Sequence, residues 1–242
     1  MTRAFDLAAK NSPNLFEHIS EPIQLNQLQV SLVPVKEIRR AIVTGHYSGV
    51  MPDACQEAFA AYTATGLLAA AVAYGPGGNS ATFNAIIPGT NNKDAREMIR
   101  AWCHPDSPKN TASFVISKTL RMLPKQVRLV VTFADTGQQH LGTIYQALNF
   151  RYLGKSSEGT RYVDSSGIEV TSRLANVYRM RNLQRFGHMT LKQIREELGW
   201  TPVVSHPKHR YAIGVGIQRH HINSILDKIS HPYPKEKMNE RD

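Results

Sequence analysis

The sequence has few cysteines, no long apolar run and fewer acidic than basic residues. Cys55 and Cys103 are its two cysteines, and they lack CxxC spacing; this excludes a disulfide scaffold or a cysteine zinc site and fits a reducing cytosol. The longest apolar run, residues 66–74, is far shorter than the roughly 20 residues that span a bilayer. The first 22 residues lack the apolar stretch of a secretion signal. We therefore expect no membrane partner and an intracellular location.

Basic residues outnumber acidic ones, and the excess lies mainly in the second part of the chain. Among 242 residues, 29 Lys and Arg face 19 Asp and Glu, a formal net charge of +10 at pH 7. Residues 1–150 carry 13 basic and 10 acidic groups, whereas residues 151–242 carry 16 and 9. This imbalance predicts an anionic partner bound by the second part. The alternative is a basic surface that serves only solubility.

Periodicity and turn residues predict an α/β chain between two irregular ends. Residues 1–30 are expected to form a loosely ordered arm, and residues 232–242 a disordered tail. Helices are predicted over residues 35–45, 106–123, 136–149 and 179–200. Strands are predicted over residues 66–78, where an Ala-rich helix is the alternative, 92–105, 127–135, 150–154, 169–178 and 208–215. This alternation favours a three-layer domain with a central mixed sheet flanked by helices.

The end of the predicted strand VRLVVTFAD is the first candidate site. Asp135 lies at its carboxyl end, where open α/β sheets place their ligand clefts, and the next helix carries Tyr145. A carboxylate there can accept a proton from an amine, and a tyrosine can protonate a leaving group. The alternatives are an Asp that caps the next helix and a Tyr packed in the core.

The segment GHYSG is the second candidate. His46 follows a predicted helix end, and its imidazole can act as a base near neutral pH, while Tyr47 can stack on a nucleobase. A histidine at this position is also a common helix cap. His46, Asp135 and His140 together offer ligands that suit iron or zinc, although no ligand spacing compels a metal site.

Two further residues are candidates for binding the donor or the substrate. Arg100, in REMIRAWCHP, lies on a predicted strand, where it can pair with Asp135 or face a substrate phosphate. Arg96 in the same segment is expected to be a solvated charge. Ser113 begins a predicted helix and can hold a donor through its hydroxyl, or it is a plain helix residue.

A basic run in the second part of the chain predicts a nucleic-acid contact. Residues 173–195 contain six basic residues and no acidic one, and phosphate contacts are the natural use of such a run. The alternative is a solvated helix face. The DNA-binding candidates are Arg179, Arg181, Arg185, Lys192, Arg195, Lys208 and Arg210.

A family resemblance rests on particular strings. LGTIYQALNFRYLG resembles the helix and strand of GNAT acyltransferases that carry a general-acid tyrosine shortly before a Gly-Phe pair. Tyr145 matches that tyrosine, Phe150 the phenylalanine, and Asn149, a further candidate for binding the donor or the substrate, replaces the glycine. GHYSG, REMIRAWCHP with NTASFVISKTL, and FADTGQQHLGTIYQALNF together resemble the Mom family of bacteriophage DNA-modification proteins over nearly the whole chain.

The resemblance implies a fold, an activity and partners. The fold is an α/β GNAT-like core over residues 31–178, completed by a basic, DNA-binding extension over residues 179–231. The activity converts adenine in double-stranded DNA to an N-carbamoylmethyl adenine at its exocyclic amine, which protects phage DNA from restriction in the host cytoplasm. Iron is the metal that the resemblance suggests, and a homodimer is left open.

The donor is where the sequence departs from the acyltransferase pattern. HPDSPKNTASF lacks the glycines of the turn that cradles the pyrophosphate of acetyl-CoA. Ser107, Asn110, Thr111 and Ser113 are expected to supply side-chain donors in its place. A glycine-derived donor such as glycyl-tRNA therefore stands beside acetyl-CoA. The alternative functions are an ordinary N-acetyltransferase of a small amine or protein and a non-catalytic DNA-binding protein.

Overall fold

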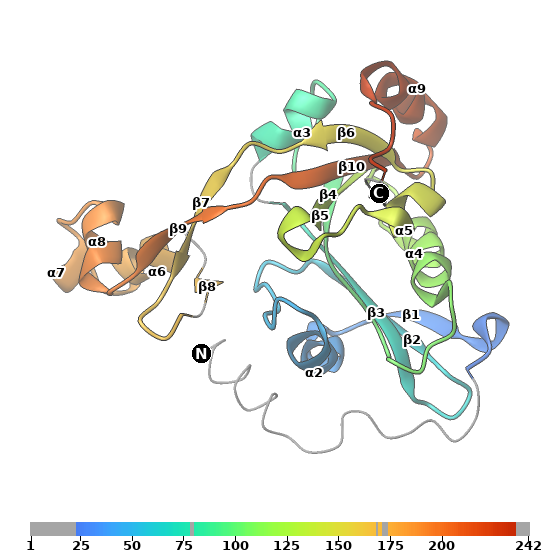
Figure 1. The fold of residues 1–242 in the computed structure, drawn as a ribbon, viewed down its shortest axis with the longest axis horizontal. Helices are drawn as coiled ribbons and strands as arrows, with labels where there is room; N and C mark the ends of the chain where they lie inside the picture. The colour runs from blue at the N-terminus through green and yellow to red at the C-terminus, as the bar shows by residue number, and fades with distance from the viewer. Residues whose placement is uncertain (1–22, 78–79, 168, 171–173, 236–242) are drawn as a thin grey trace, which may run out of the picture. The chain divides into compact units, whose positions relative to one another are not determined.

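The computed structural model of the protein describes residues 23–77, 80–167, 169–170 and 174–235 and contains two compact units (Figure 1). The first unit comprises residues 1–134, 141–154 and 209–242. The second unit comprises residues 135–140 and 155–208. The boundary expected between residues 178 and 179 falls inside the second unit.

A seven-stranded sheet forms the centre of the first unit. Its strand order is β1-β2-β3-β4-β5-β10-β6. The strands are β1 (Gln29–Val33), β2 (Glu57–Tyr62), β3 (Leu68–Gly75), β4 (Ala95–Cys103), β5 (Leu129–Asp135), β6 (Arg151–Lys155) and β10 (Lys208–Gly214). Neighbours from β1 to β4 run antiparallel, whereas β4 and β5 are parallel. The predicted mixed sheet is therefore confirmed.

The parallel pair β4 and β5 is joined over only part of its length. Ala95, Arg96 and Glu97 pair with Leu129, Val130 and Val131. Although β4 continues to Cys103 and β5 to Asp135, no further pairs join these two described strands. The Thr132 hydroxyl donates to the Met98 carbonyl at 3.2 Å, just beyond the last pair. The two strands thus separate toward their carboxyl ends.

Helices cover both faces of this sheet. α4 (Thr111–Met122) packs through Val115 and Ile116 on the face that includes Val130, and α5 (Thr143–Ala147) lies beside α4. α2 (Val35–Gly45) packs through Ile38 and Ile42 against the alanines of β2 and β3. α3 (Ser80–Ile86) and α9 (Arg219–Ile229) share a core with alternate β5 residues, on the face opposite α4. The α/β class with helices on both sides of the sheet is confirmed.

The second unit has a small core of its own. β7 (Gly159–Val163) lies between β8 (Glu169–Val170) and β9 (Thr201–Ser205). Three short helices lie between β8 and β9 in the sequence: α6 (Leu174–Arg181), α7 (Leu183–Phe186) and α8 (Leu191–Glu197). The buried residues of this core are Val170 of β8, Ala175, Phe186 and Ile194 of the helices, and Trp200, which follows α8.

Two predicted elements of this unit were wrong in part. The segment 169–178, expected to be one strand, contains the short β8 and, after residues outside the described range, the helix α6. It is helical from Leu174 onward because Ala175 is buried in the small core of the unit and Leu174 packs against that core. The helix expected over residues 179–200 is interrupted. Asn182 caps α7 by accepting from the Arg185 N–H, and Thr190 forms a capping box with Gln193.

The other predicted elements agree better with the structure. The helix over 35–45, the helix ending before Pro124 and the strands corresponding to β3, β4, β5, β6 and β10 are confirmed. The Ala-rich segment 66–78 forms β3 and not a helix. The segment 136–149 holds a 3₁₀ turn, η2 (Thr136–Gln138), and then α5. The arm predicted over 1–30 contains the start of β1, and its first 22 residues lie outside the described range, as do residues 236–242 of the predicted tail.

Membrane crossing was not expected from the sequence. Among the helices that the structure describes, none combines the length and apolar character needed to traverse a bilayer.

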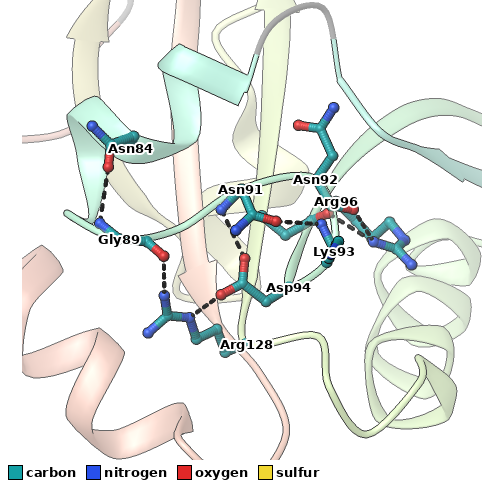
Figure 2. A network of polar contacts seen from close by, with 9 residues as sticks. Asn84, Gly89, Asn91, Asn92, Lys93, Asp94, Arg96 and Arg128 are labelled. Atoms are coloured by element: carbon teal, nitrogen blue, oxygen red, sulfur yellow. Dashed lines mark hydrogen bonds and ion pairs between the residues drawn. The ribbon is translucent and has the colours of Figure 1, made fainter.

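Arg96 is buried and paired, which corrects its expected place as a solvated charge. It is 5% exposed. Its Nε lies 2.8 Å from Glu57 Oε2 and its Nη2 lies 2.9 Å from Oε1, while Nη1 donates to the Asn92 carbonyl. Asn92 belongs to the turn before β4. Asp94 of the same turn accepts a hydrogen bond from Arg128, which precedes β5 (Figure 2). Charge alone could not place Arg96, because its partner Glu57 is 39 residues away.

Replacing Glu57 with Ala is expected to lower the free energy of unfolding by about 3–5 kcal/mol, because the Arg96 charge would remain buried without its partner. Urea denaturation measures the change. Glu196→Ala is the control, since it breaks an exposed ion pair with Lys192 whose value is at most about 1 kcal/mol. Equal effects of the two substitutions would contradict the structural role of the buried pair.

Candidate active site

A cavity of about 420 Å³ lies where β4 ends and α4 begins. The β4 end contributes Cys103 and His104, and α5 forms the facing wall through Thr143, Ile144 and Ala147. The turn before α4 and its first residues supply the rest, Ser107, Pro108, Asn110, Thr111, Ala112 and Ser113. We call this space the donor pocket. It contains all four residues that the sequence nominated in HPDSPKNTASF.

Backbone amides at the start of α4 give the donor pocket its electrostatic character. Asn110 precedes the helix with φ at 72° and makes no side-chain cap. The first-turn amides of Ala112 and Ser113 have no acceptor within the described residues, as is usual for the first turn of a helix. These N–H groups and the helix dipole favour an anion here.

The hydroxyl groups of the pocket are occupied as donors. Ser107 donates to the Ala69 carbonyl at 3.0 Å, Thr111 to Pro108 at 2.7 Å, and Ser113 to Asn110 at 3.0 Å. A hydroxyl has one proton, so these side chains retain only acceptor capacity toward a ligand. Three of the four side-chain donors expected from the sequence are thus bound to backbone carbonyls, whereas the side-chain amide of Asn110 and the backbone amides remain for an anion.

Two titratable residues of the pocket, His104 and Cys103, were not among the sequence candidates. His104 is buried, and its Nδ1 accepts from the Asp106 N–H at 3.2 Å. Cys103 is half-buried, and burial raises the pKa of its thiol to about 11. The thiol is therefore neutral at pH 7 and is not a thiolate nucleophile. The His-Pro pair that ends β4 was the one signal in the sequence for His104.

The loop after α2 presents His46 and Tyr47 together. The His46 N–H closes the helix by donating to the Ile42 carbonyl at 3.0 Å, so the expected cap is present. The Ser48 N–H donates to His46 Nδ1 at 3.2 Å, which leaves the proton of the neutral ring on Nε2. The Tyr47 ring stacks on the imidazole at 4.4 Å and is 53% exposed.

Trp102 joins this loop to the donor pocket. A Cβ at Gly45 would overlap the indole Nε1 of Trp102, so the close approach of the loop requires glycine. On its other side, Trp102 meets the His104 ring edge to face at 6.1 Å. Packing therefore runs from the end of α2 through one indole to the wall of the donor pocket.

Arg100 anchors the same loop. Its Nε donates to the Val50 carbonyl at 2.9 Å, and its Nη1 donates to the Ile99 carbonyl. Val50 follows the GHYSG segment, so Arg100 fixes the loop that carries His46 and Tyr47 to β4. These contacts give Arg100 a positioning role; the substrate contact expected from the sequence stays a prediction.

Tyr145 lies at the point where β4 and β5 separate. Its ring packs on Phe150 at 5.7 Å and on Tyr211 at 5.4 Å, and its hydroxyl forms a hydrogen bond with Thr132. Burial raises the pKa of the phenol, and the bond to Thr132 opposes part of that rise. The phenol therefore carries its proton at neutral pH, as a general acid must.

Asp135 and His140 belong to the second unit. The Asp135 carboxylate accepts from the Gly137 N–H at 2.9 Å and caps η2, which is the helix-cap alternative named from the sequence. His140 is exposed, and its N–H donates to the Asp135 carbonyl at 3.1 Å.

The metal prediction gains no support from the donor set. Within the described ranges, no three His, Cys, Asp or Glu side chains are grouped to hold a metal ion. His46, Asp135 and His140 are therefore not assigned as ligands, and iron is unsupported.

The basic candidates fall into two groups. Six of them lie in the second unit, and Arg210 lies in the first, where it donates to the Leu153 carbonyl. Arg185 pairs with Glu197 at 2.9 Å, while Arg195 lies over the Tyr162 ring at 4.6 Å. Arg181 is exposed. Lys192, Arg179 and Lys208 also lie at or near the surface.

Asn149 explains one departure from the acyltransferase pattern. Its φ is 58°, a left-handed conformation that favours glycine and that Asn tolerates better than most residues. The replacement thus preserves the turn between α5 and β6. Asn149 does not line the donor pocket but a second, larger cavity.

Comparisons with known proteins place most of the chain in one family. The model described as the Mom protein family matches residues 27–235. The methylcarbamoylase Mom of Escherichia phage Mu is 30% identical over 139 residues, which cover 56% of this chain and 57% of that protein. The match therefore spans little more than half of the relative's length.

Solved structures that match much of the chain include N-acetyltransferases. The ribosomal-protein-S18-alanine N-acetyltransferase of Escherichia coli is 10% identical, with a TM-score of 0.42 over 78% of this chain and 95% of that chain. The spermidine/spermine N-acetyltransferase SpeG of Vibrio cholerae is also 10% identical, with a TM-score of 0.44 over 83% and 98%.

Alkylation of Cys103 by iodoacetamide is expected to be more than about a hundredfold slower at pH 7.5 than that of an ordinary thiol, because its thiolate is scarce. A Cys55→Ser background isolates the site, and the rate should climb until pH about 11. The same protein in urea is the control. Equal rates for folded and unfolded chains at pH 7.5 would contradict the raised pKa.

Proposed function

The chain belongs to the Mom protein family, and on that premise we propose that it is a transferase that modifies adenine in double-stranded DNA. The family match over residues 27–235 and the likeness to the phage Mu methylcarbamoylase support this proposal. In its finer form, the exocyclic amine receives a carbamoylmethyl group, which protects phage DNA from restriction in the host cytoplasm.

The observation that carries the proposal is the donor pocket with its two open amides. The pyrophosphate of acetyl-CoA and the phosphodiesters of glycyl-tRNA are both anions that suit the start of α4. Because the pocket hydroxyls already donate to carbonyls, backbone amides are the groups that would hold either donor. Both donors therefore remain in the proposal.

The proposed transfer uses one acid, Tyr145 of the first unit. The adenine amine attacks the donor carbonyl, a C–N bond forms, and the ester or thioester bond to the carrier breaks. Tyr145 gives its proton to the departing carrier, and the proton lost by the amine passes to water. With a glycyl donor this step gives a glycyl adenine, an isomer of carbamoylmethyl adenine that is joined through its carbonyl, so the finer form of the proposal requires a further rearrangement of the adduct. With acetyl-CoA the step gives acetyl adenine.

The loop after α2 is proposed to hold the target base. An enzyme that reacts at a base amine in a duplex must extrude that base, and the exposed Tyr47 offers a ring on which it can stack. His46 donates from Nε2, because Ser48 occupies Nδ1, so we assign it to orient the base rather than to remove a proton. Arg100 positions this loop through Val50.

The basic residues of the second unit are proposed to bind the DNA backbone. Exposed Arg181 and Arg185 are the principal candidates, since the Glu197 partner of Arg185 is itself exposed and exposed ion pairs exchange easily for phosphate. A non-catalytic DNA-binding protein would use the same residues, so the products must decide between the two functions.

Nucleosides from the DNA of expressing cells are expected to contain a modified deoxyadenosine, which mass analysis detects and fragmentation assigns to glycyl or carbamoylmethyl. Tyr145→Phe should reduce it by about 10²–10⁴-fold, the usual contribution of a general acid. Tyr62→Phe is the matched control, because the Tyr62 hydroxyl lies exposed beside Glu37.

Each alternative function gives a different result in this experiment. A DNA-binding protein leaves the nucleosides unmodified, and an ordinary N-acetyltransferase leaves DNA unmodified but consumes acetyl-CoA with an amine. For the favoured function, the double variant Arg181→Ala, Arg185→Ala should lower the adduct and reduce the slope of DNA affinity against salt by about two.

Ala112→Asp tests the donor pocket without weakening the fold. A carboxylate in the first turn of α4 suits the helix dipole, so thermal stability should hold or rise. The same charge should repel an anionic donor and reduce the adduct at least tenfold. Ala112→Asn is the neutral control of similar size. Full activity of Ala112→Asp would overturn the assignment of this pocket.

A further inference from the structure

A second cavity of the first unit is larger than the donor pocket and meets it at Ala147, which lines both. Its volume is about 1150 Å³, and its walls come from α4, the end of α5, β6, the end of β10, α9 and the residues after α9. Val127, at its edge, leads into the amino end of β5, whereas the donor pocket lies at the carboxyl end of β4. Because β4 and β5 are parallel, the two spaces extend from Ala147 toward opposite ends of the sheet. We call the larger one the basal cavity.

Positive charge dominates the basal cavity. Arg121, Arg151 and Arg219 line it, together with two imidazoles, against the single carboxylate of Asp227. Arg151 donates to that carboxylate from Nε at 2.8 Å and from Nη2 at 3.2 Å. These bonds keep the pKa of Asp227 below its ordinary value. The Asp227 charge is thus already neutralised within the protein.

Two of these arginines are available to a ligand. Neither the Arg121 nor the Arg219 guanidinium has an ion pair or hydrogen bond within the described residues. Arg121 comes from the last turn of α4 and Arg219 from the first residue of α9. Two unpaired guanidinium groups at one cavity, with no free carboxylate, favour a phosphate, which they can bind through paired N–H groups.

The remaining wall suits a flat ring. Leu120, Leu148 and Ile213 give an apolar surface, and Tyr233 stands beside it. The Tyr233 hydroxyl donates to the Phe150 carbonyl at 2.8 Å, which fixes its ring while 39% of the residue stays exposed. An exposed, fixed aromatic side chain next to cationic groups is the usual platform for a nucleobase.

Asn223 adds a group that can read a base edge. Its Oδ1 accepts from the Gly214 N–H at 2.8 Å, which sets the orientation of the amide. The amide NH₂ is therefore left to donate into the basal cavity. The cavity thus combines charge for a phosphate, an apolar and aromatic wall, and an oriented donor.

We propose that the basal cavity binds a nucleotide, with its phosphate on Arg121 and Arg219 and its base beside Tyr233. The volume is sufficient for a ligand of this size, since pockets for small ligands measure about 300–1,000 Å³. Apart from Ala147, the site shares no lining residue with the donor pocket, and it does not depend on the function proposed above. A free nucleotide and the phosphorylated end of a nucleic-acid strand present the same chemistry.

Calorimetric titration of the full chain with AMP, adenosine and inorganic phosphate tests the site. AMP is expected to bind at least tenfold more tightly than either adenosine or phosphate, because only AMP engages both halves of the cavity. Arg121→Ala and Arg219→Ala should each weaken AMP binding about tenfold, the loss of one guanidinium–phosphate contact. Lys36→Ala, which removes an equal charge from α2, is the matched control and should leave affinity unchanged.

Three results would overturn the proposal. The first is an AMP affinity within twofold of wild type in the double variant that carries Arg121→Ala and Arg219→Ala. The second is binding of adenosine or of phosphate as tight as that of AMP. The third is loss of AMP binding in Ala112→Asp. The last would move the ligand to the donor pocket. Thermal melting of each variant establishes that it folds, which is expected because both arginines are exposed and unpartnered in the described residues.

A second titration separates the two sources of nucleotide. A short 5′-phosphorylated oligonucleotide that binds as tightly as AMP, or more so, and loses affinity in the double variant assigns the cavity to a strand end. Binding of AMP without the oligonucleotide assigns it to a free nucleotide. Either result leaves the test of DNA modification untouched, because that function is read from the adduct and not from AMP affinity.

Discussion

The short pairing of β4 with β5 is the constraint on which the candidate active site depends. Once the strands separate after Glu97 and Val131, the end of β4 is free to enter a turn and then α4, whose first amides face the donor pocket. Thr132 spans the start of the separation, and Tyr145 binds this threonine. The opening in the sheet, the anion-attracting helix start and the protonated phenol are therefore consequences of one local geometry.

Rigid packing around that opening comes from residues far apart in the sequence. The buried pair of Arg96 and Glu57 ties the beginning of β4 to β2. At its other end, Trp102 lies between Gly45 and the His104 ring. β4 is thus fixed at both ends, so the loop with His46 and Tyr47 and the donor pocket keep their places relative to one another.

Sequence patterns were sufficient where a residue's role is local. The run VRLVVTFAD is apolar and β-branched and forms β5, and the spacing of Ile38 and Ile42 gives α2. Sequence patterns failed where the position of a residue depends on partners that are distant in the sequence. Glu57 buries Arg96, and the small core around Ala175 makes a helix where alternation suggested a strand. The donor-pocket residues were found by position, but their hydroxyl protons are committed to carbonyls such as Ala69, which no local pattern encodes.

The start of α4 also bears on ligand choice. Main-chain amides recognise negative charge and offer little information about the molecule that carries it, so uncharged substitutions in this turn would leave the attraction intact while altering the outline of the space. If the pocket binds the donor as proposed, discrimination between carriers falls to the other side chains that line it, Thr143, Ile144 and Ala147. Homologues could exchange one activated carrier for another by reshaping this short helix, without rebuilding the anion site.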